Sequence, residues 1–129
     1  MTLPCKPEYV GVVRLTVSAI ANRMGFNIEE IEDIKVAVAE ACTNAIKHGL
    51  DEEFDASFTI FADKMTISIK DRGKGVKIEN IAEPDLSNPS ENGGLGLFII
   101  KSLMDDVDVI SSIGRGTQIT MTKFLGDDI

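Results

Sequence analysis

The chain has 129 residues, a length that suits one domain with a proper hydrophobic core. Its formal net charge of −8 argues against a nucleic-acid-binding surface, because phosphate contacts need clustered lysines and arginines. No apolar run is long enough to span a membrane, no signal peptide opens the chain and its two cysteines are far apart, so we expect a single cytoplasmic domain over residues 1–129.

The N-terminal part of the sequence predicts a short edge strand before Pro7 and then two helices. Pro7 suits the first turn of a helix, where its missing N–H group costs nothing, and Gly25 is a good stop. Between them, apolar residues recur at steps of three and four, which is typical of an amphipathic helix. Asn27 and Glu30 have the spacing of a capping box, which predicts the start of a second helix, Ile28–His48.

The second half of this second helix carries a narrow polar stripe. Glu40, Asn44 and His48 recur every four residues and therefore lie on one helical face. Solvent exposure is the simplest interpretation of a single glutamate, because charged residues are mostly exposed. Three small residues flank the stripe, and we expect them to let another molecule come close to it: Ala37, Ala41 and Ala45.

The middle of the chain predicts a β-hairpin. Residues 57–62 and 65–70 read as strands, with a short turn at Asp63. The residues before the hairpin, 51–55, are mostly acidic, and we expect them to form a loop. Asp71 stands where the second strand ends, directly before a glycine-rich segment. A carboxylate at such a position often only braces a turn.

The last part of the chain begins with a long irregular segment, residues 76–92, and such loops in compact domains are often lids. A glycine-rich turn then leads into a helix at residues 97–104, whose free N–H groups and dipole favour a phosphate. Strands are predicted at residues 107–111 and 117–123. The sequence has no P-loop motif. Together the elements predict an α+β fold, a two-layer sandwich with a mixed, mainly antiparallel sheet and helices on one face.

Three stretches resemble, in order, the N-box and the two glycine boxes of the Bergerat-fold (GHKL) ATPases: residues 37–48, 71–75 and 93–97. That superfamily contains gyrase, heat-shock chaperones, histidine kinases and mismatch-repair ATPases. Within it, the chain is most similar to the anti-sigma factors that are also serine-protein kinases, of the RsbW and SpoIIAB type. The resemblance covers nearly the whole chain. It implies the histidine-kinase-like ATPase fold, with ATP and Mg²⁺ as cofactors.

The resemblance also implies a role for each polar residue of these stretches. Asp71 would accept a hydrogen bond from the adenine amino group, and Thr117 would help to hold the adenine. Asn44 would offer its side-chain oxygen to Mg²⁺, a hard ion that prefers oxygen ligands. Glu40, one helical turn earlier, would be the general base that draws the proton from a serine hydroxyl. The residues that would line the base and wrap the phosphates are Gly73, Gly75, Gly93, Gly94, Leu95 and Gly96.

The partners implied by the resemblance are a sigma factor, which the protein would sequester, and an anti-anti-sigma antagonist, which it would phosphorylate on serine. Family members form homodimers through the first strand and first helix, and an arginine at the place of Arg14 helps to grip the protein partner. Taken alone, Arg14 reads as a surface residue. Asn92 stands where some of these kinases have an arginine that reaches the γ-phosphate, so the efficiency of transfer is left open.

Two other functions remain open at this point. One is a nucleotide-gated anti-sigma binding module without kinase activity, although the presence of Glu40 argues against it. The other is the catalytic domain of a sensor histidine kinase, which normally follows a dimerisation helix that bears the phosphorylated histidine. The single histidine of this sequence, His48, lies instead in the helix of the N-box.

Overall fold

The computed structural model describes residues 1–48, 53–73, 94–112 and 115–126. In chain order they form β1 (Thr2–Pro4), a 3₁₀ turn (Pro7–Tyr9), α1 (Val10–Met24), α2 (Ile28–His48), β2 (Glu53–Ile60), β3 (Lys64–Asp71), α3 (Gly94–Leu103), β4 (Asp106–Ser112) and β5 (Gly116–Phe124). No helix in these ranges has the length and apolar character needed to cross a membrane.

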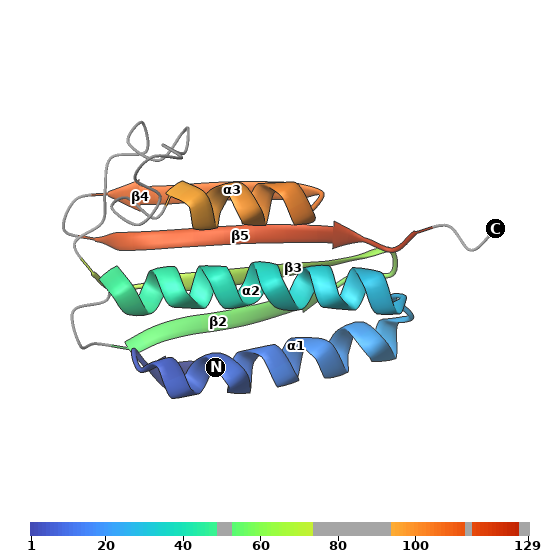
Figure 1. Ribbon diagram of the computed structural model, residues 1–129, viewed down its shortest axis with the longest axis horizontal. Helices are drawn as coiled ribbons and strands as arrows, with labels where there is room; N and C mark the ends of the chain where they lie inside the picture. The colour runs from blue at the N-terminus through green and yellow to red at the C-terminus, as the bar shows by residue number, and fades with distance from the viewer. Residues whose placement is uncertain (49–52, 74–93, 113–114, 127–129) are drawn as a thin grey trace.

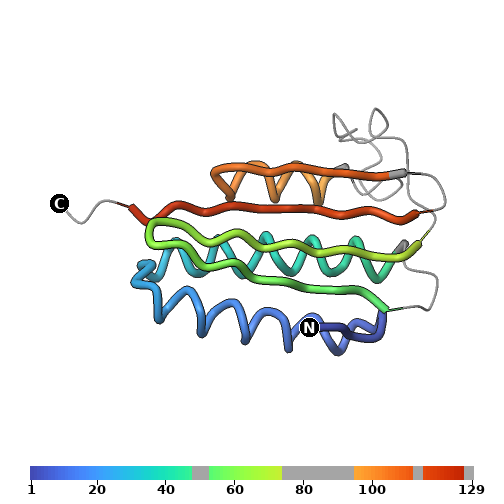
Figure 2. Tube along the Cα trace, turned by 180° about the vertical axis from the view of Figure 1, so that it is seen from behind, coloured from blue at the N-terminus to red at the C-terminus, as the bar shows by residue number. Residues whose placement is uncertain are grey.

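The strands form one sheet in the order β1-β2-β3-β5-β4, and the helices pack against one of its faces (Figure 1). Figure 2 shows the opposite face of the sheet, with the helices behind it. Each pairing between neighbouring strands is antiparallel. The predicted α+β two-layer sandwich is therefore confirmed, and the sheet is antiparallel throughout the described strands.

The hydrophobic core lies between the two layers. On β3, the buried residues Met65, Ile67 and Ile69 alternate with polar residues on the open face, as a strand with one covered face requires. Val13 and Val17 of α1 are fully buried and lie four residues apart on one helical face. The apolar periodicity of the sequence thus marks the surfaces that meet in this core.

Three alanines of α2 also belong to the core: Ala37, Ala41 and Ala45. They have at most 2% of their surface exposed. The expectation that they let another molecule come close to the helix is therefore wrong. A step of four residues is also the spacing of a helix face that packs on a sheet, and small side chains on that face allow a close approach.

The prediction of a loop over residues 51–55 is wrong for residues 53–55, the part of this segment that the structure describes. These residues belong to β2, which begins at Glu53. Phe54 is fully buried, whereas Glu53 and Asp55 point to the open face of the sheet. Acidic residues have low strand propensity, but here alternation with buried residues decides the conformation.

The start of α2 confirms the predicted capping box. The side-chain oxygen of Asn27 accepts a hydrogen bond from the N–H of Glu30 at 2.8 Å, and the Glu30 carboxylate accepts one from the N–H of Asn27 at 2.9 Å. Gly25, with a φ of 99°, ends α1 in the left-handed conformation that favours glycine. These signals fix where α2 begins and so which of its residues face α3.

Candidate functional site

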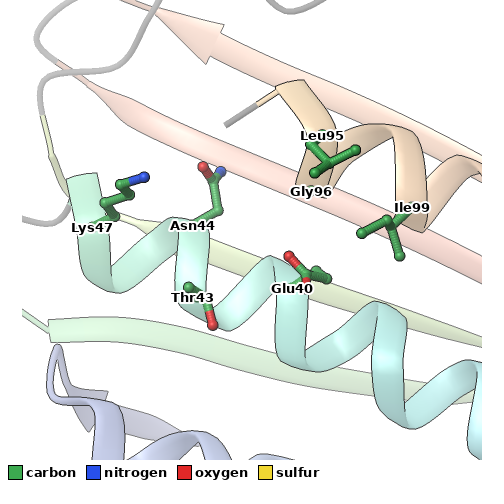
Figure 3. Close-up of a pocket in the computed structure, with 7 residues that line it drawn as sticks. All are labelled: Glu40, Thr43, Asn44, Lys47, Leu95, Gly96 and Ile99. Atoms are coloured by element: carbon green, nitrogen blue, oxygen red, sulfur yellow. The ribbon is translucent and has the colours of Figure 1, made fainter. Parts of the chain in front are cut away.

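A groove of about 200 Å³ lies between α2 and α3 (Figure 3). Two of its lining residues, Glu40 and Asn44, belong to the predicted polar stripe, and Leu95 and Gly96 belong to the second glycine box. The lining is completed by Thr43, Lys47 and Ile99. Figure 3 shows the carboxylate, carboxamide and ammonium groups along the side of α2 that faces α3. The structure therefore brings together two of the three stretches on which the functional hypothesis depends.

Glu40 and Gly96 are in close contact across this groove. A Cβ atom on Gly96 would lie 3.0 Å from Oε2 of Glu40, which is tighter than an ordinary van der Waals contact. The glycine leaves room for the carboxylate beside the first turn of α3. Because Asn44 follows Glu40 by one helical turn, one side chain can meet a metal ion while the other meets a nucleophile.

The second glycine box is helical where it is described, which corrects the prediction of a turn before the helix. Gly94 is the first residue of α3, so Leu95 and Gly96 lie in its first turn. The first N–H groups of an α-helix have no partner within the helix, and together with the helix dipole they favour an anion. The start of α3, which lies beside the polar stripe of α2, is therefore a favourable place for an anion.

Asp71 is a buried carboxylate at the end of β3, with 2% of its surface exposed. Its Oδ1 accepts hydrogen bonds from the N–H groups of Gly73, at 2.8 Å, and Thr117, at 3.3 Å. The hydroxyl of Thr117 lies 2.8 Å from that of Ser111 on β4. Asp71 and Thr117 are thus neighbours, and Asp71 also braces its turn, as the simpler interpretation of this residue predicted.

Gly116, directly before Thr117, is a residue that the sequence analysis did not assign to the site. Its φ of 84° lies in the region that favours glycine, and a Cβ atom there would clash with the carbonyl oxygen of Asp71. A glycine next to the threonine was the available signal. The other residues that sequence reasoning did not assign to the site line the groove: Thr43, Lys47 and Ile99.

The parts of the candidate site meet at one end of the molecule. The C-terminal ends of α2 and β3 lie there with the N-terminal ends of α3 and β5, in the views from both sides (Figures 1 and 2). Asp71 and Thr117 are not among the residues that line the α2–α3 groove. Arg14 lies apart from both, exposed on α1. Some residues of the predicted site lie outside the described residues: Gly75, Gly93, Asn92 and the predicted lid at residues 76–92.

The donor set of the groove fits Mg²⁺ held mainly by a nucleotide. Among the described residues, no group of three or more histidine, cysteine, aspartate or glutamate side chains could hold a metal ion. Mg²⁺ commonly keeps several waters and binds through one or two protein oxygens together with substrate phosphates. Asn44, in the groove beside the first turn of α3, is suited to supply such an oxygen.

Comparison with known proteins identifies the family of the chain. The histidine kinase-like ATPase domain family matches residues 3–123. The chain is 47% identical to the serine-protein kinase RsbW of Halalkalibacterium halodurans, over 99% of this chain and 83% of that protein. This chain belongs to the RsbW family of histidine kinase-like ATPases. Another RsbW, from Oceanobacillus iheyensis, is 45% identical over 99% of this chain and 87% of its own length.

A solved structure outside the RsbW family shows the same fold. It is the histidine kinase domain from the blue-light activated histidine kinase of Erythrobacter litoralis EL346, with a TM-score of 0.59 and 19% sequence identity. The match covers 95% of this chain and 61% of that one. At this identity the likeness concerns the fold alone, which supports the predicted histidine-kinase-like architecture of this RsbW family member.

Proposed function

We propose that this protein is an ATP-dependent serine-protein kinase and anti-sigma factor, which sequesters a sigma factor and phosphorylates an anti-anti-sigma antagonist on serine. The observation that carries the proposal is the groove in which Glu40 and Asn44 face the glycine-rich first turn of α3. The relatives named serine-protein kinase RsbW support the kinase over a binding module without activity and over a histidine-kinase catalytic domain.

Glu40 is the general base in the proposed reaction. It accepts the proton from the hydroxyl of the substrate serine, whose oxygen then attacks the γ-phosphorus of ATP. The bond between that phosphorus and the oxygen it shares with the β-phosphate breaks, and ADP leaves with the electron pair. Mg²⁺, held by Asn44 and by the phosphates, would supply charge neutralisation during this transfer.

The remaining residues of the proposed site bind the nucleotide. Asp71 accepts a hydrogen bond from the adenine amino group, and Thr117 and Gly73 hold that carboxylate in place through their N–H groups. The start of α3, from Gly94, binds the phosphates. Lys47 lines the groove and offers a cation to them. By resemblance to the family, we also assign Gly75 and Gly93 to this site.

The proposed partner surface lies on α1, away from the groove. Arg14 is exposed there, and so are the apolar side chains of Val12, at 40%, and Leu15, at 75%. Exposed apolar residues beside an arginine are typical of a protein–protein interface. We assign Arg14 to the contact with the sigma factor or antagonist, and a homodimer to α1 and the neighbouring β1. We also assign the protein to the cytoplasm, where ATP and the transcription machinery are found. We assign residues 1–129 to one domain, which is supported by the hydrophobic core that the described helices and strands share.

The experiment that tests the function combines the purified protein, candidate antagonist proteins and γ-labelled ATP. Phosphoserine should form on the antagonist, and Glu40→Gln should lower the rate by about a hundredfold or more, since loss of a general base has effects of this size. Calorimetry should show that the variant still binds ATP. Transfer that survives the substitution would remove Glu40 from the role of base.

A matched control is Glu32→Gln, which changes an exposed glutamate on the same helix. Its side chain forms only a surface ion pair with Lys35, at 3.2 Å, so this change should leave transfer unaffected. If no antagonist is phosphorylated but ATP still gates binding of a sigma factor, the module without kinase activity is the correct function.

A further inference from the structure

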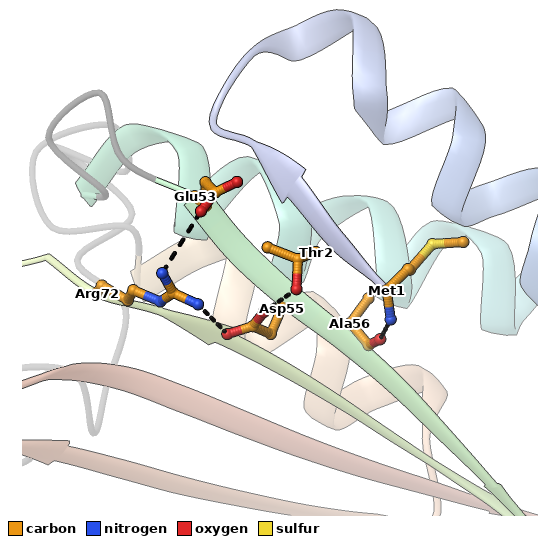
Figure 4. A network of polar contacts seen from close by, with 6 residues as sticks. All are labelled: Met1, Thr2, Glu53, Asp55, Ala56 and Arg72. Carbon is orange, nitrogen blue, oxygen red and sulfur yellow. Dashed lines mark hydrogen bonds and ion pairs between the residues drawn. The ribbon is translucent and has the colours of Figure 1, made fainter.

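Arg72 is the residue between Asp71 and Gly73, in the turn that follows β3, and its side chain joins a network of polar contacts (Figure 4). Its guanidinium group contacts two carboxylates of β2. Nη1 lies 3.5 Å from Oε1 of Glu53, and Nη2 donates a hydrogen bond to Oδ2 of Asp55 at 3.2 Å. One cation therefore joins the turn beside Asp71 to two residues of the neighbouring strand.

These contacts extend the attachment of β3 to β2 beyond their backbone ladder. The last residue pair of that ladder is Phe54 with Asp71. In an antiparallel register, the next pair along would be Glu53 with Arg72, and their ion pair stands at that position. Side chains alternate along a strand, so the Asp71 carboxylate is buried under the helices while the Arg72 guanidinium lies on the open face.

Asp55, the closer partner of Arg72, is itself fixed in position. The hydroxyl of Thr2, on β1, donates a hydrogen bond to Oδ1 of Asp55 at 2.6 Å. This bond is the largest cause that lowers the pKa of Asp55, partial burial opposes it, and the hydrogen bond and charge of Arg72 lower it further. The N-terminal ammonium of Met1 donates to the carbonyl of Ala56 at 2.6 Å, which ties β1 to the same strand.

The opposite side of the turn rests on β5. A Cβ atom on Gly116 would clash with the Asp71 carbonyl and would lie 3.1 Å from Cα of Arg72. Thr117 donates its N–H to the Asp71 carboxylate. Backbone contacts with β5 and ion pairs with β2 thus hold the turn from two directions, and of these two restraints only the ion pairs depend on exposed side chains.

We propose that Arg72 is a positioning residue for nucleotide binding. Its contacts with Glu53 and Asp55 hold the turn of residues 71–73, so that the Asp71 carboxylate meets the adenine in a fixed orientation. A site that is already ordered loses less conformational entropy when its ligand binds. The inference rests on the proposed function, in which Asp71 recognises adenine, and adds a residue that touches neither the base nor the phosphates.

The expected effect is moderate. Single ion pairs at exposed positions contribute little, but here two carboxylates share one guanidinium, and networks of this kind contribute more than isolated pairs. We expect Arg72→Ala to weaken binding of a non-hydrolysable ATP analogue by about threefold to tenfold, the range that corresponds to loss of such a network. The KM for ATP should rise by a similar factor while kcat stays near the wild-type value, because Glu40 is unchanged.

The test compares four variants of the full chain by calorimetry with that analogue. Lys70→Ala is the matched control: it removes the same charge from the same face of the sheet, two residues earlier, at a position of β3 where the ladder pairs the strand with both neighbours. It should bind as the wild type does. Arg72→Lys should recover part of the affinity. The double variant Glu53→Gln with Asp55→Asn should weaken binding in the same direction as Arg72→Ala, because it removes both carboxylate charges that pair with the guanidinium.

The outcomes separate this inference from the function on which it rests. If the wild type binds no adenine nucleotide, the proposed function itself fails. If the wild type binds and Arg72→Ala has the same affinity, the inference is overturned. A lower melting temperature for Arg72→Ala with unchanged affinity also overturns it, because that result describes a structural role only. Equally weakened binding in Lys70→Ala would also overturn it, because the effect would then come from the loss of any positive charge on this face of the sheet.

Discussion

Oε2 of Glu40 lies 3.0 Å from the point that a Cβ atom on Gly96 would occupy. Glu40 is in the middle of α2 and Gly96 is in the first turn of α3, so the proposed base and the proposed phosphate-binding turn share one small volume. A side chain at position 96 and the carboxylate of Glu40 cannot both keep ideal positions. This competition makes the glycine a test of the site that does not alter the base itself.

Gly96→Ala should lower the rate of phosphate transfer by about tenfold, since small displacements of a catalytic group have effects of this order or larger. The new methyl group would push the end of the Glu40 side chain by a few tenths of an ångström. Stability should stay equal or rise slightly, because alanine is favoured over glycine within a helix. Initial rates and thermal unfolding of the same variant measure the two effects.

The control for this change is Gly11→Ala on α1, where a Cβ atom would meet no other atom within 4 Å. It has the same helical benefit and lies outside the groove, so at saturating antagonist it should leave the rate of transfer at the wild-type value. Equal rates for the wild type and Gly96→Ala would show that the carboxylate is not held against α3 during the reaction.

Asp71→Asn should weaken ATP binding by about tenfold or more. This is the cost expected when a buried group in the site can no longer form its hydrogen bond with the ligand. Asparagine keeps an oxygen that can accept the N–H groups of Gly73 and Thr117, so the fold should survive. Its amide N–H₂, however, would face the adenine amino group, and two donors repel. Calorimetry with ATP and with GTP measures the affinity and the preference between bases. Unchanged affinity for ATP would refute the assignment of Asp71 to the adenine.

Much of the fold could be predicted because its signals are local. The capping box of Asn27 and Glu30 depends on residues three apart, and the alternation along β3 depends on neighbours. The start of β2 was missed because Glu53 and Asp55 suit a loop by composition. They are strand residues because their neighbour Phe54 is buried and because Arg72, far away in the chain, pairs with them.

The site was predictable only in part, because local patterns encode some of its features and contacts between distant residues create the others. The spacing of Glu40 and Asn44 on one helical face is a local property, and the structure places both in the groove. The approach of Gly96 to Glu40 depends on how α3 packs on α2, which no local pattern encodes. Gly116 resembles any turn glycine until the backbone of Asp71 lies against it. A local pattern can also mislead. Three alanines of α2 recur every four residues, a spacing that fits a face exposed to a ligand as well as a face buried in the core, and the structure buries them: Ala37, Ala41 and Ala45.

Arg14→Ala should weaken binding of the sigma factor or the antagonist by about tenfold, as expected for an arginine at the centre of an interface. Nucleotide affinity should not change, because Arg14 is on α1 and α2 separates that helix from α3 (Figure 1). Pull-down assays and calorimetry measure the two properties. Arg23→Ala, an exposed arginine in the last turn of the same helix, is the control and should bind both partners normally. Normal binding by both variants would leave Arg14 as a surface residue.

The stability of the protein should fall at alkaline pH because of Cys42. Burial raises the pKa of this thiol from 9.0 to about 12. Above pH 9 the unfolded chain loses the thiol proton while the folded chain keeps it, so the stabilisation is complete below pH 9 and is lost as the pH rises toward 12. By pH 10.5 the loss should reach about 2 kcal/mol, given 1.36 kcal/mol for each pKa unit. Urea unfolding of the wild type and of Cys42→Ala at pH 8 and pH 10.5 measures it. The variant should lose less stability between the two pH values, and an equal loss in both proteins would contradict the prediction.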